Sequence, residues 1–441
     1  MQDKVTPRIL PGFMELLPAD QILFNDMYDK IRSVYESFGF LPLDTPTIEL
    51  SEVLLAKAGG ETEKQIYRFN KGDNDLSLRF DQTVPLARYV SMHYNDLVFP
   101  FKRYQMSKVF RGERPQKGRF REFYQCDIDI IGNEELSILY DAEMPAIIYQ
   151  VFKKLNIGDF TVRINNRKVL GGFFANLGLS DKIGDILRVI DKIDKIGAEA
   201  VVKELITVGV PEEKTADIIA FIGIKGDRKT MIEKLRTLGV ENETFQNGVD
   251  ELETVTDAMI MFGMPESCFR IDLTIARGLD YYTGTVYETV MNDHPEFGSV
   301  CGGGRYDNLT GYYTDKKLPG IGISIGLTRL FSQLRDNAII APKSGTMADV
   351  LIVPMDKDTV PYAVSVATKF REAGIPADVY YGEKGMKQKM KYAGRSGFPY
   401  AAVIGSNEAA NGTLALKDML GEGGQKTVTV GEAIEILKAC N

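Results

Sequence analysis

The chain has 441 residues, of which 44% are hydrophobic and 26% charged, and its formal net charge is −8. This length allows two or three domains of ordinary globular composition. No apolar run is long enough to cross a membrane, the first residues lack the apolar core of a secretory signal, and the acidic total argues against non-specific binding to nucleic acid.

The cysteines and histidines exclude several classes of site. The four cysteines lie far apart without a CxxC pair, and only two histidines are present, His93 and His294. This spacing predicts neither a zinc site nor a disulfide framework and is typical of a reducing compartment. We therefore expect a cytoplasmic protein whose own side chains bind no metal and that uses no histidine-based triad.

The first predicted element is a helix from Asp20 to Phe38, with one apolar stripe and Gly39 at its end. The extended segment that follows, FLPLDTPTIEL, contains two prolines that are unsuited to a central strand. Taken alone, the two segments indicate a surface helix and an edge strand.

The segment LSLRFDQTVPLAR predicts a buried strand that leads into a helix, with Asp81 and Thr83 at the start of the helix. Asp and Thr are common caps at helix N-termini. The pattern alone therefore does not require a binding site here.

A predicted β-hairpin spans Phe101 to Gly132, with the polar loop RGERPQKGR between its strands. Both strands alternate, so each has two faces of different character. The polar face of the second strand carries Gln125, Asp127 and Asp129.

Basic residues are concentrated in this hairpin. Lys102 to Glu122 contain eight basic and two acidic residues, an excess of six positive charges in an acidic protein. Basic runs are often only solvated surface. Arginines beside carboxylates on a hairpin also suit a site that holds phosphates and a cationic amine together, because a guanidinium fork matches pairs of phosphate oxygens.

After a helix that we expect from Glu134 to Leu155 and a strand, FTVRIN, the sequence becomes a series of helices up to about Met264. The helices are expected at 180–196, 198–208, 212–222, 229–238 and 249–263. They lack polar clusters, so this region is predicted to be a helical insertion, either purely structural or in contact with a partner.

Two segments beyond Phe269 combine unusual residues. The first, RGLDYYTGTVYE, begins at Arg277 and contains paired tyrosines, and the second, GSVCGGGRYD, places three glycines before Arg305 and Tyr306. Paired tyrosines are often core residues and a glycine triplet is often a bend. The next segment, LPGIGISIGLTRLFSQL, predicts a strand that runs into a helix with Arg329 in its first turn.

Small and turn-forming residues at 336–348 predict a linker. Strands and helices then alternate, which predicts a small α/β domain. Its second helical region carries the basic residues Lys384, Lys387, Lys389, Lys391 and Arg395, with tyrosines nearby. Such a helix is either simply solvated or a surface for a single-stranded RNA loop, which selects charge combined with aromatic rings.

The basic hairpin resembles motif 2 of the class II aminoacyl-tRNA synthetases. The first helix with its extended segment resembles motif 1, and the strand and helix around Arg329 resemble motif 3. The two segments after Phe269 are similar to the histidine-specific motifs of the histidyl-tRNA synthetases, and the resemblance covers nearly the whole chain. It implies an α+β fold, with a class II catalytic domain at 1–335 that has a mixed, mainly antiparallel sheet and a helical insertion at about 167–264. An α/β anticodon-binding domain follows at 349–441, and motif 1 implies a homodimer.

The resemblance also implies a site. The residues implied to bind histidine are Asp81, Gln82, Thr83, Arg111, Gln125, Asp129, Arg277, Tyr281, Tyr282, Gly304 and Tyr306. Those implied to bind ATP are Arg111, Glu113, Arg119, Phe123 and Arg329. Those implied to contact tRNA are Gln116, in the hairpin loop, and Lys384, Lys387, Lys391 and Arg395.

Roles follow from the same resemblance. Arg111 and Arg277 are expected to be catalytic and to meet the α-phosphate from two sides. Asp129 and Tyr282 are expected to contact the two imidazole nitrogens. The ammonium would be held by Asp81, Thr83 and Gln125, the outer phosphates by Arg119 and Arg329, and the adenine by Glu113 and Phe123. Gln116 is the residue expected to meet the extra 5′ guanosine of the tRNA.

The implied function is ATP-dependent ligation of L-histidine to tRNA(His) through a histidyl-adenylate, with Mg²⁺ bridging the ATP phosphates. The main alternative is the non-catalytic, histidine-binding paralogue that regulates ATP phosphoribosyltransferase. The arginine of RGLDYYTG and the attached basic C-terminal domain argue against it. Another class II synthetase and a stand-alone RNA-binding module are further alternatives; Asp129 with the paired tyrosines disfavours the former, and the hairpin carboxylates the latter.

Overall fold

The computed structural model describes residues 4–56, 61–114, 118–275, 282–308, 310–342, 344–421 and 424–439. The chain divides into two compact units, one of Met1–Met14 and Tyr28–Ile339 and the other of Glu15–Met27 and Ile340–Asn441. We describe each unit by itself. The domain limits inferred from the sequence stay predictions.

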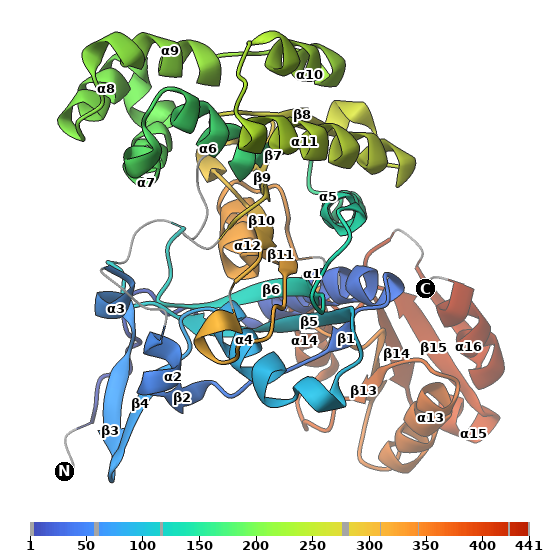
Figure 1. Ribbon diagram of the computed structural model, residues 1–441. Helices are drawn as coiled ribbons and strands as arrows, with labels where there is room; N and C mark the ends of the chain where they lie inside the picture. Colours follow the sequence, from blue (N-terminus) through green and yellow to red (C-terminus); the bar gives the residue numbers. More distant parts are fainter. Residues whose placement is uncertain are drawn as a thin grey trace. The chain divides into compact units, whose positions relative to one another are not determined.

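The larger unit is built on an eight-stranded sheet in the order β1-β5-β6-β11-β10-β9-β7-β8 (Figure 1). The strands are β1 (Leu41–Pro42), β5 (Phe101–Phe110), β6 (Glu122–Ile131), β11 (Gly320–Ile325), β10 (Cys301–Tyr306), β9 (Thr285–Met291), β7 (Phe160–Asn166) and β8 (Phe269–Ile271). Only the two edge strands, β1 and β8, run parallel to their neighbours. The predicted mixed, mainly antiparallel sheet is therefore confirmed.

The hairpin of β5 and β6 forms as the alternation predicts. The apolar face of β6 is fully buried at Cys126, Ile128 and Ile130. Two tyrosines of α1 (Pro18–Ser37) approach this face, because Tyr28 Oη donates to the Met106 carbonyl at 3.1 Å and Tyr35 Oη to the Cys126 carbonyl at 3.0 Å. The opposite, polar face of β6 is left for the site.

A three-stranded antiparallel sheet, in the order β2-β4-β3, precedes the hairpin. Its strands are β2 (Ile48–Leu50), β3 (Arg68–Lys71) and β4 (Asn74–Leu78), and the short helices α2 (Ser51–Leu55) and α3 (Glu61–Gln65) lie between β2 and β3 in sequence. The chain leaves β4 and enters α4 (Thr83–Met92). Asp81 thus lies between a strand and a helix, as the sequence predicts.

Helices α5 (Leu139–Leu155) and α12 (Leu327–Asp336) contribute further to the core of this unit. The helical region consists of α6 (Arg167–Asn176), α7 (Ile183–Ile190), α8 (Ile193–Thr207), α9 (Glu212–Ile222), α10 (Arg228–Thr237) and α11 (Glu243–Met261). The break predicted between two helices at residue 197 is present, because Gly197 has φ 78° and interrupts α8.

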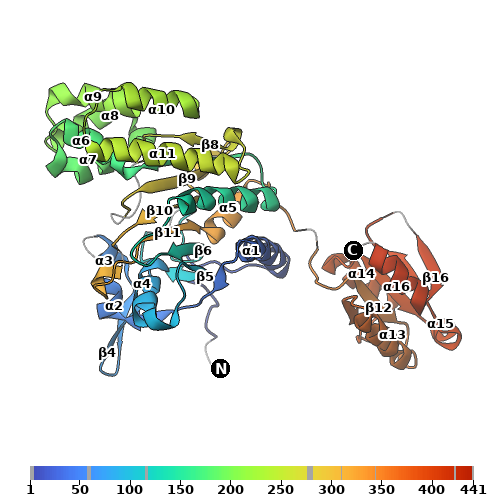
Figure 2. The same cartoon turned by 45° about the vertical axis from the view of Figure 1, so that its right-hand side comes forward.

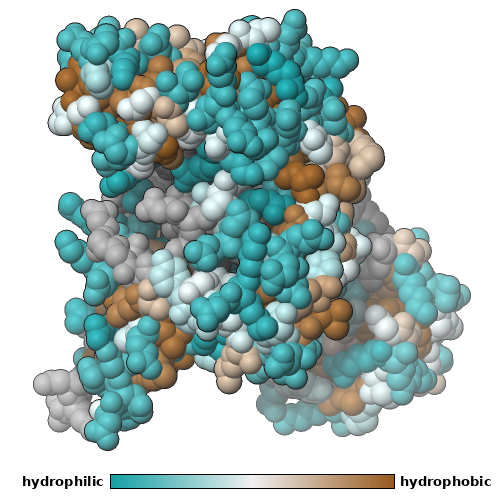
Figure 3. All heavy atoms as spheres, viewed as in Figure 1, coloured by the Kyte–Doolittle hydropathy of each residue, from teal (hydrophilic) through white to brown (hydrophobic). Residues whose placement is uncertain are grey.

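These six helices form a layer next to β7, β8 and β9 (Figures 1 and 2). The face of this layer seen in Figure 3 is mainly hydrophilic, with apolar atoms showing between the helices. Buried Phe173 and Phe221 stack with ring centroids 3.8 Å apart and join α6 to α9. In the part of the chain that the structure describes, no helix is both long and apolar enough to cross a membrane.

The smaller unit contains a five-stranded sheet in the order β13-β12-β14-β15-β16. The strands β12 (Val350–Pro354), β13 (Ala377–Val379) and β14 (Tyr400–Ile404) are parallel, whereas β15 (Thr413–Asp418) and β16 (Gln425–Thr429) are antiparallel additions. The helices are α13 (Val360–Glu372), α14 (Met386–Ser396), α15 (Ser406–Asn411) and α16 (Val430–Ala439). The alternating α/β pattern is confirmed, and β15 and β16 were not predicted.

Candidate active site

Two cavities in the larger unit share three lining residues, Arg111, Gln125 and Ser324. The inner cavity measures about 70 Å³ and is lined by Asp81, Thr83, Arg111, Gln125, Asp127, Asp129, Tyr282, Tyr306, Gly322, Ile323 and Ser324. The outer cavity measures about 380 Å³ and is lined by Arg111, Glu113, Gly118, Arg119, Phe120, Phe123, Gln125, Ser299, Val300, Cys301, Gly302, Ser324, Gly326 and Arg329. Motifs that are distant in sequence therefore meet in one site.

Asp129 lies in the inner cavity and is held at both carboxylate oxygens. Arg103, which is completely buried, places Nη2 2.6 Å from Asp129 Oδ2, and Tyr306 Oη donates to Asp129 Oδ1 at 2.7 Å. Burial raises the pKa of Asp129, while Arg103 and the bond from Tyr306 act in the opposite direction. The carboxylate is therefore fixed before any ligand enters.

Gln125 is oriented by a chain of hydrogen bonds. Its Nε2 donates to Ser324 Oγ at 2.7 Å, and Ser324 acts to lower the pKa of Asp127 against the effect of burial. The carbonyl oxygen Gln125 Oε1 is buried without a hydrogen-bond partner among the described residues, so it is a free acceptor.

Asp81 serves as a helix cap and also lines the inner cavity. Its Oδ1 accepts a hydrogen bond from the backbone N–H of Val84 at 3.0 Å, in the first turn of α4. The capping interpretation of this sequence is thus correct, and it does not exclude the binding one, since a carboxylate has a second oxygen. Thr83 begins α4 and lines the same cavity.

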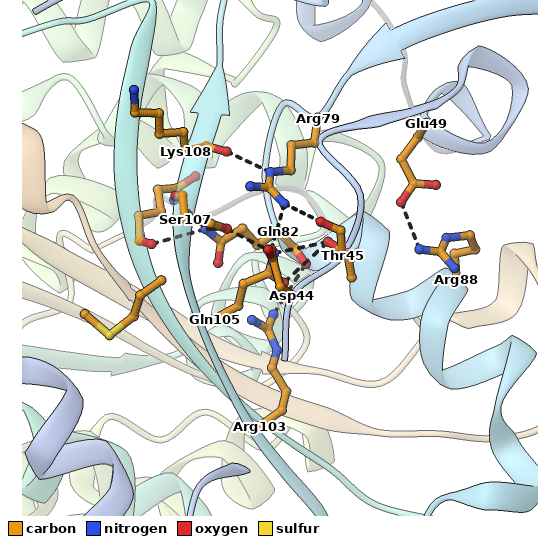
Figure 4. A network of polar contacts seen from close by, with 12 residues as sticks. Asp44, Thr45, Glu49, Arg79, Gln82, Arg88, Arg103, Gln105, Ser107 and Lys108 are labelled. Carbon is orange, nitrogen blue, oxygen red and sulfur yellow. Dashed lines mark hydrogen bonds and ion pairs between the residues drawn. The ribbon is translucent and has the colours of Figure 1, made fainter. Parts of the chain in front are cut away.

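Gln82, a predicted histidine-binding residue, lines neither cavity and is completely buried behind them. Its Nε2 donates to the Ser107 carbonyl at 2.9 Å and to the Gln125 carbonyl at 3.1 Å, which ties α4 to both strands of the hairpin (Figure 4). Arg103 Nη2 donates to the Gln82 carbonyl at 3.4 Å. These hydrogen bonds place the Gln82 side chain where it supports the inner cavity.

Two glycines let the inner cavity form where β10 and β11 run side by side. A Cβ at Gly322 would lie 2.1 Å from Asp129 Oδ1, and one at Gly304 would lie 2.5 Å from the Thr285 carbonyl oxygen and 3.0 Å from the ring of Tyr282. Gly304 therefore allows the close approach of the neighbouring strand and of Tyr282, and Gly322 leaves room for Asp129. This explains part of the glycine-rich sequence of these strands.

Arg111 lies at the junction of the cavities. Its guanidinium carbon is 4.5 Å from the ring centre of Phe80 and 5.1 Å from that of Phe123, and its Nε donates to the Phe80 carbonyl at 3.2 Å. Two aromatic faces hold a guanidinium group in place by cation–π attraction. Arg111 is accordingly pre-positioned between the space predicted for histidine and the space predicted for ATP.

The other four predicted ATP residues also line the outer cavity. Arg119 pairs with Glu113 at 3.2 Å, and Arg329, in the first turn of α12, donates from Nη2 to the Phe297 carbonyl at 2.6 Å. The sequence predicts that Arg119 and Glu113 contact different parts of ATP, and in this structure the two side chains contact each other.

Three predicted site residues lie outside the described part of the chain: Arg277, Tyr281 and Gln116. Their predicted roles stay predictions. The basic residues Lys384, Lys387, Lys391 and Arg395 are all exposed, and the last three follow at helical spacing along α14. Lys389 differs from them: it is buried, and its Nζ donates to the Pro354 carbonyl at 2.6 Å.

Sequence reasoning gave no role to several lining residues. Asp127 was placed on the polar face of β6 and then left unused, although its alternation with Gln125 and Asp129 was a usable signal. Ser299, Cys301 and Ser324 carried no signal of their own, because their positions depend on strand pairings that bring β6, β10 and β11 together.

Comparisons with known proteins agree with this arrangement. Residues 12–330 match the family model described as histidyl-tRNA synthetase, and residues 349–439 match an anticodon binding domain. A histidine–tRNA ligase from Clostridium tetani is 59% identical, with 99% of each chain covered, and one from Xanthomonas axonopodis is 47% identical over 95% of this chain and 93% of the other. The crystal structure of histidyl-tRNA synthetase from Nostoc sp. superimposes with a TM-score of 0.92 at 44% identity, covering 99% of this chain and 100% of that one. The resemblance seen in the sequence is confirmed: the chain belongs to the histidyl-tRNA synthetase family.

Proposed function

We propose that this protein is an enzyme, a histidine–tRNA ligase, which activates L-histidine with ATP and transfers it to tRNA(His). The observation that carries the proposal is the junction at Arg111, where a small cavity with three carboxylates opens into a larger one with three arginines. The alternative, a regulatory paralogue, is less supported, because relatives named as ligases match along the full length of the chain.

In the first step a carboxylate oxygen of histidine attacks the α-phosphorus of ATP, and the bond to pyrophosphate breaks. Negative charge collects around one phosphorus, so the step needs fixed positive groups and no side-chain nucleophile. Arg111 is the described residue placed for this task, and we assign Arg277 to the opposite side of the phosphate. The outer phosphates are assigned to Arg119 and Arg329, and the adenine to Glu113 and Phe123.

Histidine selection is assigned to the inner cavity. Gln125 Oε1, Asp81 and Thr83 supply acceptors for the ammonium, while Asp129 and Tyr282 lie where the ring would be. A buried site built to hydrogen-bond ring nitrogens rejects analogues that lack them by about 10⁴–10⁵-fold, because its polar groups are then left unpaired.

In the second step a hydroxyl of the 3′-terminal ribose of tRNA attacks the histidyl carbonyl, and AMP leaves. We assign the hydroxyl proton to a phosphate oxygen of the adenylate. The tRNA is assigned to Gln116 and to the exposed basic face of α14 formed by Lys387, Lys391 and Arg395, with Lys384 beside it.

Mg²⁺ would arrive with ATP. Among the described residues no group of three His, Cys, Asp or Glu side chains could hold a metal ion, and Glu113 is the carboxylate of the outer cavity. These residues fit an ion that is bound mainly by phosphate oxygens and water. When bound, the ion would offset phosphate charge.

A cytoplasmic homodimer is the assembly we propose. The segment that resembles motif 1 exposes apolar side chains, since Leu41 is 58%, Ile48 47% and Leu50 44% exposed. A second copy of the chain would bury them. Sedimentation equilibrium tests the dimer, and replacing Leu41 and Ile48 by Ser should favour the monomer.

The test of the function is ATP–pyrophosphate exchange with each of the twenty amino acids, followed by charging of tRNA(His). We expect exchange with histidine alone and acylation of this tRNA. A purified protein that binds histidine and exchanges no pyrophosphate would support the regulatory paralogue.

A further inference from the structure

Asp127, a residue that lines the inner cavity, has a buried carboxylate oxygen with no hydrogen-bond partner among the described residues. Asp127 lies on β6 between Gln125 and Asp129, is 3% exposed and lines the cavity. Its Oδ1 has no partner in the described chain. A buried acceptor left unpaired is unfavourable, which marks the oxygen as one that a ligand completes.

The two neighbouring carboxylates differ in what remains available. Asp129 already has Arg103 at one oxygen and Tyr306 at the other. Asp127 Oδ1 has no hydrogen-bond partner among the described residues. Of the two side chains, Asp127 is therefore the one with a carboxylate oxygen that no described group contacts.

The charges around the cavity require a cationic or N–H-rich ligand. Three carboxylates, Asp81, Asp127 and Asp129, line the cavity, and two guanidinium groups face them: Arg111 at the junction and Arg103 behind Asp129. The positive charge of Arg103 acts on both Asp127 and Asp129. Among the described residues the carboxylates therefore outnumber the guanidinium groups by one, which favours a ligand with N–H donors.

We propose that Asp127 is a further specificity-determining residue, whose Oδ1 accepts a hydrogen bond from a ring N–H of the bound histidine. Asp129 holds Arg103 and Tyr306 in place and keeps the contact with the ring that is assigned to it above. The inference rests on the proposed function and adds to it a residue that neither the motifs nor the resemblance assigned.

The ionisation of Asp127 suits this role. Burial raises the pKa of its carboxyl group to about 7, against the opposing influence of Arg103 and Ser324. A group with this pKa is partly ionised at neutral pH, so a donor from the ligand can complete the ionisation at small cost. An N–H of histidine supplies this donor, whereas a hydrocarbon ring does not.

The experiment compares the full-length protein with Asp127→Asn, which keeps the shape and removes the charge. Histidine affinity is measured by calorimetry, and the KM values for histidine and ATP by pyrophosphate exchange. We expect the Kd for histidine to rise about 10–100-fold, the value of a hydrogen bond to a charged group, with the KM for ATP within about twofold of the wild type.

A matched carboxylate-to-amide change is available in the outer cavity. Glu113→Gln should show the reverse pattern, with a higher KM for ATP and an unchanged Kd for histidine. If Asp127→Asn raises both KM values equally, Asp127 supports the whole site and the proposal is wrong.

A ligand comparison separates recognition from structure. Thienylalanine has a ring of similar shape without an N–H, so its inhibition constant should be the same for the wild type and Asp127→Asn. An equal loss of affinity for histidine and thienylalanine would show a structural defect and overturn the inference, as would an unchanged histidine Kd in the variant. If instead the wild type fails to activate histidine, the proposed function itself is wrong.

Discussion

The inner and outer cavities differ in how they would hold the ligands that we propose for them. The inner one, about 70 Å³, is walled by strands of the main sheet, and two of its carboxylates, Asp127 and Asp129, are almost completely buried. The outer one, about 380 Å³, depends on arginines that remain in part accessible, with the Arg119 side chain 55% exposed. A site that selects one small amino acid needs rigid walls from which water is excluded. A triphosphate can instead be bound by long side chains that adjust their conformation to it.

The largest effect is expected at Arg111, where the two cavities meet. Arg111→Lys keeps the charge and loses the planar fork and its stacking between Phe80 and Phe123. The first-order rate of histidyl-adenylate formation should fall about 10²–10³-fold, because the lost interaction forms with charge that develops in the transition state. Single-turnover pyrophosphate release measures it.

A control for Arg111 lies three residues further on. Arg114 is exposed and lines neither cavity. Arg114→Lys should leave the rate within about twofold of the wild type. A normal rate in Arg111→Lys would mean that the junction of the cavities is not where the chemistry occurs.

A pair of glycines compares the two cavities directly. At Gly322, in the inner cavity, an added Cβ would lie 2.1 Å from Asp129 Oδ1, whereas at Gly302, in the outer cavity, the nearest atom would be the Tyr287 carbonyl oxygen at 3.2 Å. Gly322→Ala must displace Asp129, and a misplacement of about 1 Å can cost about 100-fold in kcat/KM for histidine.

Gly302→Ala should change kcat/KM for histidine by no more than a few-fold, because a contact of that length requires only a small shift. Both variants are compared by exchange kinetics and by thermal unfolding. Equal effects on histidine would show that the inner cavity is not the more rigid of the two.

A smaller effect is expected in the outer cavity at Arg119. Glu113, the ion-pair partner of Arg119, lies on the same loop. The Arg119 side chain is accessible, so solvent weakens each of its ion pairs. Arg119→Ala should raise the KM for ATP about 10-fold with the Kd for histidine unchanged, while Arg114→Ala changes neither. If Arg119→Ala also changed the Kd for histidine, ligand binding in the two cavities would be coupled more closely than proposed.

For the outer cavity, the sequence predicted the residues that we propose to bind ATP, but few of the other residues that line the cavity. Alternation in the hairpin predicted the faces of β5 and β6, and the resemblance supplied Arg111, Glu113, Arg119, Phe123 and Arg329, all of which line one cavity. Ser299, Cys301 and Gly302 lie in the segment GSVCGGGRYD that the sequence analysis singled out, but their place in the outer cavity depends on the pairing of β10 with β9 and β11. Long-range strand pairing leaves no local pattern.

The inner cavity shows another limit of sequence reasoning. A polar residue next to the site can either support the site or line it, and the sequence pattern is the same for both. Gln82 was expected to bind the ligand and is buried behind the cavity, whereas Asp127 received no role and lines it. Only the positions of partners such as Ser107 and Ser324 separate the two cases.

The smallest predicted effect concerns stability and follows from the burial of the inner carboxylates. The pKa of Asp127 is raised to about 7 in the folded protein, above its unfolded value near 3.8, with Arg103, Asp129, Asp81 and Ser324 facing it. The unfolded chain therefore loses its proton first, so this group stabilises the fold fully below about pH 4 and the contribution is lost as pH rises to 7. Asn does not titrate. The Tm of Asp127→Asn relative to wild type, measured without ligand by calorimetry, should be about 2–4 °C higher at pH 8 than at pH 5.

Bound histidine should reverse the difference in Tm between Asp127→Asn and the wild type at pH 8. At pH 8 a saturating concentration should raise the Tm of the wild type more than that of Asp127→Asn, because the ligand binds more tightly to the ionised carboxylate of the wild type. A Tm difference independent of pH would mean that Asp127 is already ionised and paired in the free protein. The carboxylate of Asp127 would then not be available to accept a hydrogen bond from histidine.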